Sequence, residues 1–158
     1  MDTLRTVGNL GANYMLAGRL TEAIPLLEEA HRASRKHAVL RFVGPHLLDA
    51  YAKAGKPAEA ARLIDDRLAE ARQALPKDSP QLAGLLAQSG MNLLEMKGFA
   101  EADALFRESL AIREKLQPDD WTTFNTKSML GGALLGQKKY AEAEPRMVKG
   151  YEGMKARE

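Results

Sequence analysis

The sequence carries the stretch KGFAEA at residues 97–102, and it returns as KKYAEA at residues 138–143. Two earlier stretches follow the same pattern, AGRLTEA at residues 17–23 and AGKPAEA at residues 54–60. The final alanines, at positions 23, 60, 102 and 143, are separated by 37, 42 and 41 residues. Self-similarity at such a period is typical of a solenoid, in which each unit buries its apolar face against its neighbours.

Each unit fills most positions of the tetratricopeptide pattern, Trp-x2-Leu-Gly-x2-Tyr followed by Ala, Phe and Pro. The i, i+3, i+4 and i+7 spacing places one apolar stripe on a first helix, and small residues let a second helix approach it closely. The Leu slot holds Leu10, Leu47, Ser89 and Leu130, the small slot Gly11, Leu48, Gly90 and Gly131, the Tyr slot Tyr14, Tyr51, Leu93 and Leu134, and the Phe slot Leu27, Ile64, Phe106 and Met147. The chain therefore resembles a tetratricopeptide repeat array over essentially its whole length.

Two features refine this resemblance. The units run near 42 residues instead of the usual 34, which resembles the long-helix repeats of kinesin light chains. The runs QPDDW at residues 117–121 and GGALLGQKKY at residues 131–140 are also similar to arrays that follow the kinase domain of some bacterial serine/threonine kinases. The pattern departs from the family at the Trp slot, which holds Val7, Gly44, Leu86 and Lys127.

The repeats predict an all-α fold, a right-handed superhelical solenoid of four helix-turn-helix pairs. We expect one domain over residues 1–158, a fragment of a longer array, with repeats near 3–36, 39–75, 80–116 and 119–156. Asp78 or Ser79, and Asp119 or Asp120, are expected to cap the helices that follow them. Gly44 and Pro45 predict that the second pair is shorter or kinked. The expected helices are 3–17, 20–36, 43–54, 57–75, 80–96, 99–116, 119–136 and 140–156.

Composition and charge exclude several classes of protein. The absence of cysteine removes disulfides, thiolate metal sites and cysteine nucleophiles. The net charge is +2, and acidic residues interrupt the basic ones, so we expect no nucleic-acid partner. No apolar run is long enough to span a membrane, and the first residues lack the order of a signal peptide. The sequence predicts an unprocessed cytoplasmic protein with no membrane partner.

Apparent catalytic motifs have simpler explanations. The run GGALLGQK at residues 131–138 is similar to a phosphate-binding loop, but Gln137 stands where that loop needs lysine. The spacing of His31, His37 and His46 presents no pair of metal ligands on one helical face. No nucleophile with a base and an orienting group can be assembled. We therefore predict that the protein is not an enzyme and has no catalytic residue, metal or cofactor.

What remains is the face of each first helix that points away from the core stripe, which would line a concave groove. Amide side chains there could pair with a peptide backbone, and methionine could adapt to apolar side chains. This predicts a scaffold that binds a protein or peptide; the alternative is a solvated helix face without a ligand. The predicted groove residues are Arg5, Asn9, Asn13, Phe42, His46, Asp49, Gln88, Asn92, Asn125 and Met129.

Two other interpretations stay open. One is a structural module that forms a homo-oligomer, because the terminal helices carry apolar residues that tend to be buried by association. These residues are Leu4, Val7, Met147, Val148, Tyr151 and Met154. The other is a regulatory tail of a larger signalling kinase, which changes the context of the array without changing its physics.

Overall fold

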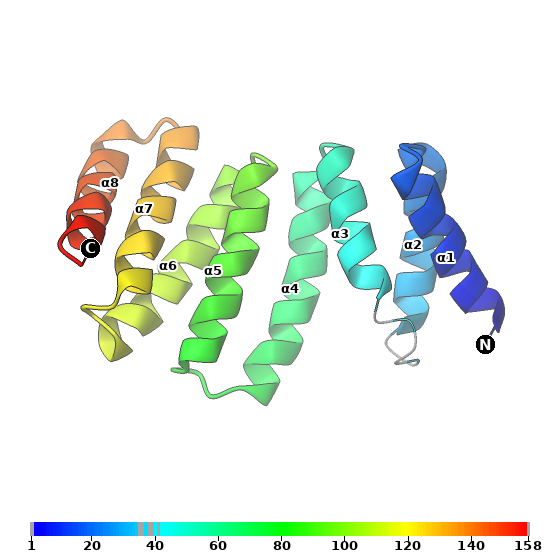
Figure 1. Ribbon diagram of the computed structural model, residues 1–158, viewed down its shortest axis with the longest axis horizontal. Coiled ribbons are helices and arrows are strands. Elements are labelled where there is room, and N and C mark those ends of the chain that lie inside the picture. The colour runs from blue at the N-terminus through cyan, green and yellow to red at the C-terminus, as the bar shows by residue number, and fades with distance from the viewer. Residues whose placement is uncertain (1, 35–36, 38–39, 41, 158) are drawn as a thin grey trace. The chain divides into compact units, whose positions relative to one another are not determined.

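The computed structural model describes residues 2–34, 37, 40 and 42–157. Within these ranges it contains eight helices and no strand, which confirms the all-α prediction. The first helix of the fourth repeat begins at Trp121, two residues later than expected, because Asp120 caps it. The helices are α1 (Asp2–Leu16), α2 (Leu20–Ser34), α3 (Val43–Lys53), α4 (Pro57–Ala74), α5 (Pro80–Glu95), α6 (Phe99–Leu116), α7 (Trp121–Gly136) and α8 (Tyr140–Lys155) (Figure 1).

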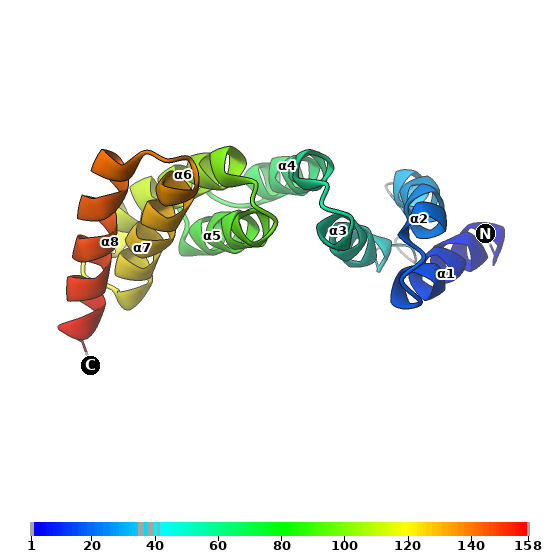
Figure 2. The ribbon, with the colours of Figure 1, turned by 90° about the horizontal axis from the view of Figure 1, so that it is seen from above.

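The helices divide into two compact units, residues 1–63 and 64–158, with the boundary inside α4. In the first unit α2 packs against both α1 and α3. In the second unit α6 packs against α5 and α7, and α7 packs against α8, a pair that lies side by side in both views (Figures 1 and 2). Three of the four expected helix pairs, α1 with α2, α5 with α6 and α7 with α8, are therefore present within the units. The single domain and the right-handed superhelical path concern how the units join, and they stay predictions.

Each helix pair turns at a residue with left-handed backbone, with φ between 62° and 74°. The next residue donates its backbone N–H to the carbonyl of the Tyr-slot residue, at 2.8–3.0 Å in all four turns. This six-to-one bond closes the helix end and fixes where the second helix starts. The turns fall at equivalent positions of the repeat and so support its alignment. The left-handed residues are Gly18, Gly55, Lys97 and Lys138.

Small residues at the helix crossings set how closely paired helices pack. The four repeat alanines are at most 1% exposed. On α5, a Cβ built on Gly90 would lie 2.8 Å from Cε1 of Phe106, a ring that is fully buried on α6. No real Cβ tolerates that approach, so a side chain at this position would displace the ring. The small slot and the Phe slot of the repeat are thus two sides of one contact.

Two positions depart from the repeat. Leu10 is 41% exposed, whereas Leu47 and Leu130 in the same slot are 2% and 0% exposed. The preceding helix, α2 or α6, packs on the helix that carries Leu47 or Leu130, and α1 is the first helix of the described residues. The helix α3 has 11 residues and begins at Val43, which confirms the shorter second pair. Pro45 then lies in the first turn, where its missing N–H would have no intrahelical acceptor.

Side-chain caps begin two of the first helices. Ser79 Oγ accepts a hydrogen bond from the backbone N–H of Leu82 at 3.2 Å, at the start of α5. Asp120 Oδ1 accepts from the backbone N–H of Thr122 at 2.8 Å, at the start of α7. The expected caps are therefore confirmed, and the structure selects Ser79 and Asp120 from the two pairs of candidates.

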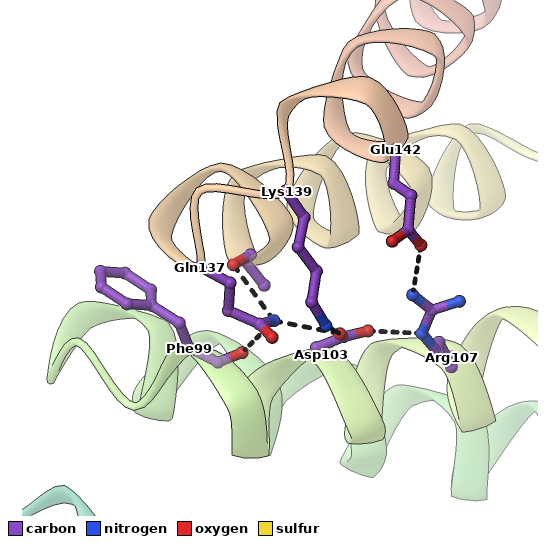
Figure 3. A network of polar contacts seen from close by, with 7 residues as sticks. Phe99, Asp103, Arg107, Gln137, Lys139 and Glu142 are labelled. Atoms are coloured by element: carbon purple, nitrogen blue, oxygen red, sulfur yellow. Dashed lines mark hydrogen bonds and ion pairs between the residues drawn. The ribbon is translucent and has the colours of Figure 1, made fainter.

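A buried carboxylate ties the turn between α7 and α8 to α6 (Figure 3). Asp103 on α6 is 7% exposed, and Gln137 Nε2 donates to its Oδ2 at 3.0 Å and to the carbonyl of Phe99 at 3.2 Å. Arg107 Nε donates to Asp103 Oδ1 at 2.5 Å, and Lys139 Nζ lies 3.8 Å from Oδ2. A buried charge is stable only when it is paired and hydrogen-bonded, and Asp103 is both. The contact fixes the fourth repeat on the third.

We predict that Gly90→Leu lowers the free energy of unfolding by about 1–3 kcal/mol or more, because the new side chain must displace Phe106. Gly84→Ala on the same helix is the matched control. A Cβ there meets no atom within 4 Å, and alanine raises helix propensity, so a gain of up to about 1 kcal/mol is expected. Chemical denaturation measures both. Equal stabilities of Gly90→Leu and wild type would contradict the alignment of the repeats.

We predict that the stability contributed by Asp103 depends on pH. Burial alone would raise the pKa of Asp103, but hydrogen bonds from Gln137 and Arg107 outweigh it, so the pKa is lowered. A carboxyl whose pKa is lowered by folding stabilises the fold above its unfolded pKa of about 3.9, and this contribution is lost as the pH falls through the folded value. Asp103→Asn should cost about 1–3 kcal/mol at neutral pH and less in acid.

The control for this experiment is Asp78→Asn, which removes an ion pair with Lys115 between two side chains that are about half exposed. Exposed pairs contribute about 0–1 kcal/mol, so this variant should stay close to wild type. Denaturation midpoints measured between neutral and acidic pH decide the matter. A cost of Asp103→Asn that does not change with pH would show that its charge is not what stabilises the turn.

Candidate functional site

In the first unit, the predicted groove residues of α1 lie on one exposed face. Arg5, Asn9 and Asn13 are each exposed and follow one another at four-residue spacing, which places them along one side of a helix. Gly8, about 100° around α1 from Asn9, faces α3, and a Cβ built on it would lie 3.1 Å from Val43 and 3.3 Å from the Phe42 ring. Because α1 and α3 approach closely there, their outer faces are adjacent.

The groove residues of α3 already interact with one another or with neighbours. The rings of Phe42 and His46 meet edge to face, with centroids 6.0 Å apart, and both residues are half-buried. Asp49 is exposed, but its Oδ2 lies 2.9 Å from Nζ of Lys53 one turn later. The aromatic pair therefore offers an apolar contact, whereas the Asp49 charge is partly neutralised.

In the second unit, three of the predicted residues come together around one open hollow of about 200 Å³. Gln88 on α5 faces Asn125 and Met129 on α7 across this hollow. Asn92 lies one turn beyond, and its Oδ1 accepts a hydrogen bond from Gln88 Nε2 at 3.3 Å. The hollow is lined by Gly84, Ala87, Gln88, Met91, Arg113, Trp121, Thr122, Asn125, Thr126 and Met129.

The second helix α6 contributes a cation to this hollow. Arg113 is only 9% exposed, and its Nε donates to Ser109 Oγ at 3.3 Å. Ser109 Oγ in turn donates to the carbonyl of Ala83 on α5 at 2.7 Å. Burial lowers the pKa of Arg113, and the charge of Asp120 opposes that shift. The guanidinium nevertheless keeps its charge, because arginine side chains stay protonated in proteins at physiological pH.

Two residues of the hollow, Arg113 and Trp121, were not predicted from the sequence as site residues. Phe106, Leu110 and Arg113 follow the i, i+4, i+7 spacing of a buried stripe, and an arginine on such a stripe is a signal that the sequence does contain. Trp121 is the first residue of α7 and is 52% exposed, so its ring stands at the edge of the hollow. Arg113 was missed because only the first helices were expected to line the groove, whereas Arg113 lies on the second helix α6.

The residues predicted for self-association differ in exposure. On α8, Met147, Val148 and Tyr151 are 38%, 46% and 60% exposed, while Met154 is half-buried. Leu4 and Val7 on α1 are also half-buried. The exposed apolar surface among these residues therefore lies mainly on α8.

The structure places the other noted motifs in ordinary roles. The glycine-rich run at residues 131–136 belongs to α7, and a Cβ on Gly131 would lie 3.2 Å from the carbonyl of Ala143 on α8. This glycine serves helix packing. Among the described residues, no three His, Cys, Asp or Glu side chains are grouped so that they could hold a metal ion. In the same part of the chain, no helix is both long and apolar enough to cross a membrane.

Comparison with known proteins gives two family matches. Two family models, each described as tetratricopeptide repeat, match residues 14–89 and residues 83–116. Together they cover residues 14–116, well over half of the chain. No curated protein matches the sequence.

Solved structures share the fold at low sequence identity. BtubC (BKLC) from P. vanneervenii is 17% identical, with a TM-score of 0.62, and the match covers 97% of this chain and 63% of BtubC. A variant of a kinesin-light-chain-type protein of Podosopora anserina, which has nearly identical TPR-like repeats, is 21% identical with a TM-score of 0.58. That match covers 94% of this chain and 73% of the other. The expected kinesin-light-chain-like repeat fold is confirmed, and this chain spans less than two thirds of BtubC.

Proposed function

The chain belongs to the tetratricopeptide repeat family, and on that premise we propose that it is a non-catalytic scaffold that binds a protein or peptide along its first helices. Repeats of this family generally mediate contacts between proteins. The observation that carries the proposal is the hollow between α5 and α7, where amide and thioether side chains from two repeats converge. Such convergence is what a peptide-binding surface requires.

The chemistry of this hollow suits an extended segment better than a substrate. Gln88 and Asn125 can donate to and accept from a peptide backbone, and Met91 with Met129 can adapt to its side chains. Arg113 is the one ionisable side chain among the residues that line the hollow. A hydrolytic or transfer reaction needs a nucleophile with a base beside it, and this lining offers no base to activate its threonine hydroxyls. Binding without chemistry is the function that these residues support.

The cellular context follows from the same proposal. A chain without cysteine is suited to a reducing compartment, so we place the protein in the cytoplasm. Its array would form part of a longer one, as the partial coverage of BtubC suggests. In the variant of this proposal that the sequence raised, the array serves as the regulatory tail of a signalling kinase.

We predict that replacing Asn92 and Asn125 of the second unit together with alanine weakens a groove ligand about tenfold, because two backbone hydrogen bonds are lost at about 0.5–1.5 kcal/mol each. The ligand is first obtained by selecting a phage-displayed library of random peptides on the whole chain. Calorimetry then compares affinities, and circular dichroism confirms that the variant stays folded. The matched control is Gln73→Ala, which removes an exposed amide from the second helix α4.

A stronger test changes the charge of the groove in the second unit, with glutamate at positions 88, 92 and 125. Three carboxylates in and beside the hollow should abolish binding of any ligand that lies there. Undiminished binding to such a folded variant would place the ligand elsewhere and contradict the proposed function.

A second candidate function, self-association, is favoured by the exposed apolar side chains on α8. We predict that Met147→Lys with Tyr151→Lys reduces self-association, because two ammonium groups would have to be desolvated in the contact. Sedimentation over a concentration series measures it. The control Glu70→Lys, an exposed position on α4 outside this surface, changes the net charge by the same amount. A wild-type chain that stays monomeric throughout would exclude this function.

A further inference from the structure

The guanidinium of Arg113 is buried without a carboxylate partner. Its Nε bond to Ser109 is the hydrogen bond that the structure gives it, and no ion pair joins it to a carboxylate in the part of the chain that is described. The Nη groups therefore keep their N–H donors for the hollow, which Arg113 lines. Arginine is seldom buried to this extent unless it is paired, so the burial of Arg113 without a carboxylate needs a physical reason.

Two arginines of the same unit, Arg72 and Arg107, have carboxylate partners although they are more exposed. Arg72 donates to Glu108 through Nε and Nη2, at 3.1 and 2.7 Å. Arg107 pairs with Asp103 at 2.5 Å, and its side chain is 44% exposed. Among the described residues, both of these exposed cations have a carboxylate partner, whereas Arg113 has none. The contrast indicates that the partner of Arg113 is supplied from outside the chain.

Asp120, the carboxylate whose charge acts on Arg113, is already engaged. Asp120 influences the pKa of Arg113, but no ion pair joins the two among the described residues. Asp120 Oδ1 instead accepts from both the backbone N–H and the hydroxyl of Thr122. These bonds cap α7 and hold the carboxylate at the helix end. Asp120 therefore attracts Arg113 from a distance without neutralising it.

We propose that Arg113 selects an acidic side chain of the bound peptide, an Asp or Glu whose carboxylate enters the hollow and accepts two hydrogen bonds from the guanidinium. The inference rests on the proposed function, since it names the chemistry that the groove would recognise. Arginine presents parallel N–H donors that match a carboxylate. Met91, Met129 and Trp121 supply apolar walls for the methylene groups of the same side chain.

The burial of Arg113 makes this recognition selective. A desolvated cation gains more from a carboxylate than an exposed one does, because the surrounding dielectric constant is lower. A neutral isostere such as glutamine would leave the guanidinium buried and unpaired. The site should therefore discriminate between Glu and Gln, which have nearly the same shape.

The first experiment isolates the Arg113 site from the rest of the groove. Trp121 is the sole tryptophan of the chain and lies at the edge of the hollow, so its fluorescence reports on occupancy. The probes are N-acetyl-glutamate amide and N-acetyl-glutamine amide, titrated at constant ionic strength. We expect a saturable change with the glutamate probe alone, and its loss in Arg113→Gln. Equal responses to the two probes, or no response to either, would overturn the inference.

The second experiment uses amidated synthetic peptides derived from the phage selection. We expect an acidic residue at one fixed position. Replacing this residue with its amide should weaken binding about tenfold or more, and so should Arg113→Gln. The two changes together should weaken binding no more than either change alone, because both remove the same interaction. Arg113→Lys keeps the positive charge but lacks the paired N–H donors, so its affinity should lie between those of wild type and Arg113→Gln. Lys149→Gln, an exposed change of equal charge on α8, should have no effect.

The outcomes separate this inference from the proposed function. Peptides that lose affinity with Asn92→Ala but not with Arg113→Gln would overturn the inference and leave the scaffold function standing. Failure to select any peptide would overturn both. Binding that requires a free C-terminus would assign Arg113 to a terminal carboxylate and refute the side-chain form. A melting temperature of Arg113→Gln equal to or above that of wild type is expected, whereas a clear drop would make Arg113 a structural residue.

Discussion

The close approach of paired helices at glycine and alanine positions is the constraint on which the rest of the structure depends. Gly90 leaves room for the ring of Phe106, and Ala102 on the same second helix is completely buried. Dispersion contacts and apolar burial between the closely spaced helices stabilise each pair. An additional methyl group at such a position would push the two helices apart. With the pair fixed, the left-handed residue of the turn determines where the second helix starts. The next first helix then has a defined surface to pack on.

Two buried charges on α6 illustrate how the same physics can serve structure or binding. Asp103 receives hydrogen bonds from Gln137 and Arg107, and through them it holds the turn that follows α7. Arg113, about three turns further along α6, has a hydroxyl of Ser109 as its hydrogen-bonded neighbour. A buried charge that is paired and hydrogen-bonded makes a junction rigid. A buried charge without an opposite charge beside it favours the binding of one. We therefore assign the first to the fold and the second to the proposed site.

The sequence predicted those features that depend on local or periodic information. The helix order, the turns and the caps of Ser79 and Asp120 follow from patterns within a single repeat, and so does the shortened α3. The network around Asp103 joins residues 34 positions apart, and no spacing rule indicates it. The exposure of Leu10 was also beyond the pattern, because the repeat assigns a slot without stating whether a neighbour covers it.

The candidate site was predicted in part for the same reason. Gln88, Asn125 and Met129 were found because helical geometry fixes the face of a first helix. The hollow itself depends on positions of these helices that carry no large side chain. Gly84 and Gly90 lie six positions apart on α5, and helical rotation turns them to different sides. Toward α6 the missing side chain admits the Phe106 ring, whereas a Cβ on Gly84 would meet nothing within 4 Å. Small residues on α5 therefore bring helices together where a partner faces them, and leave space for a ligand where none does.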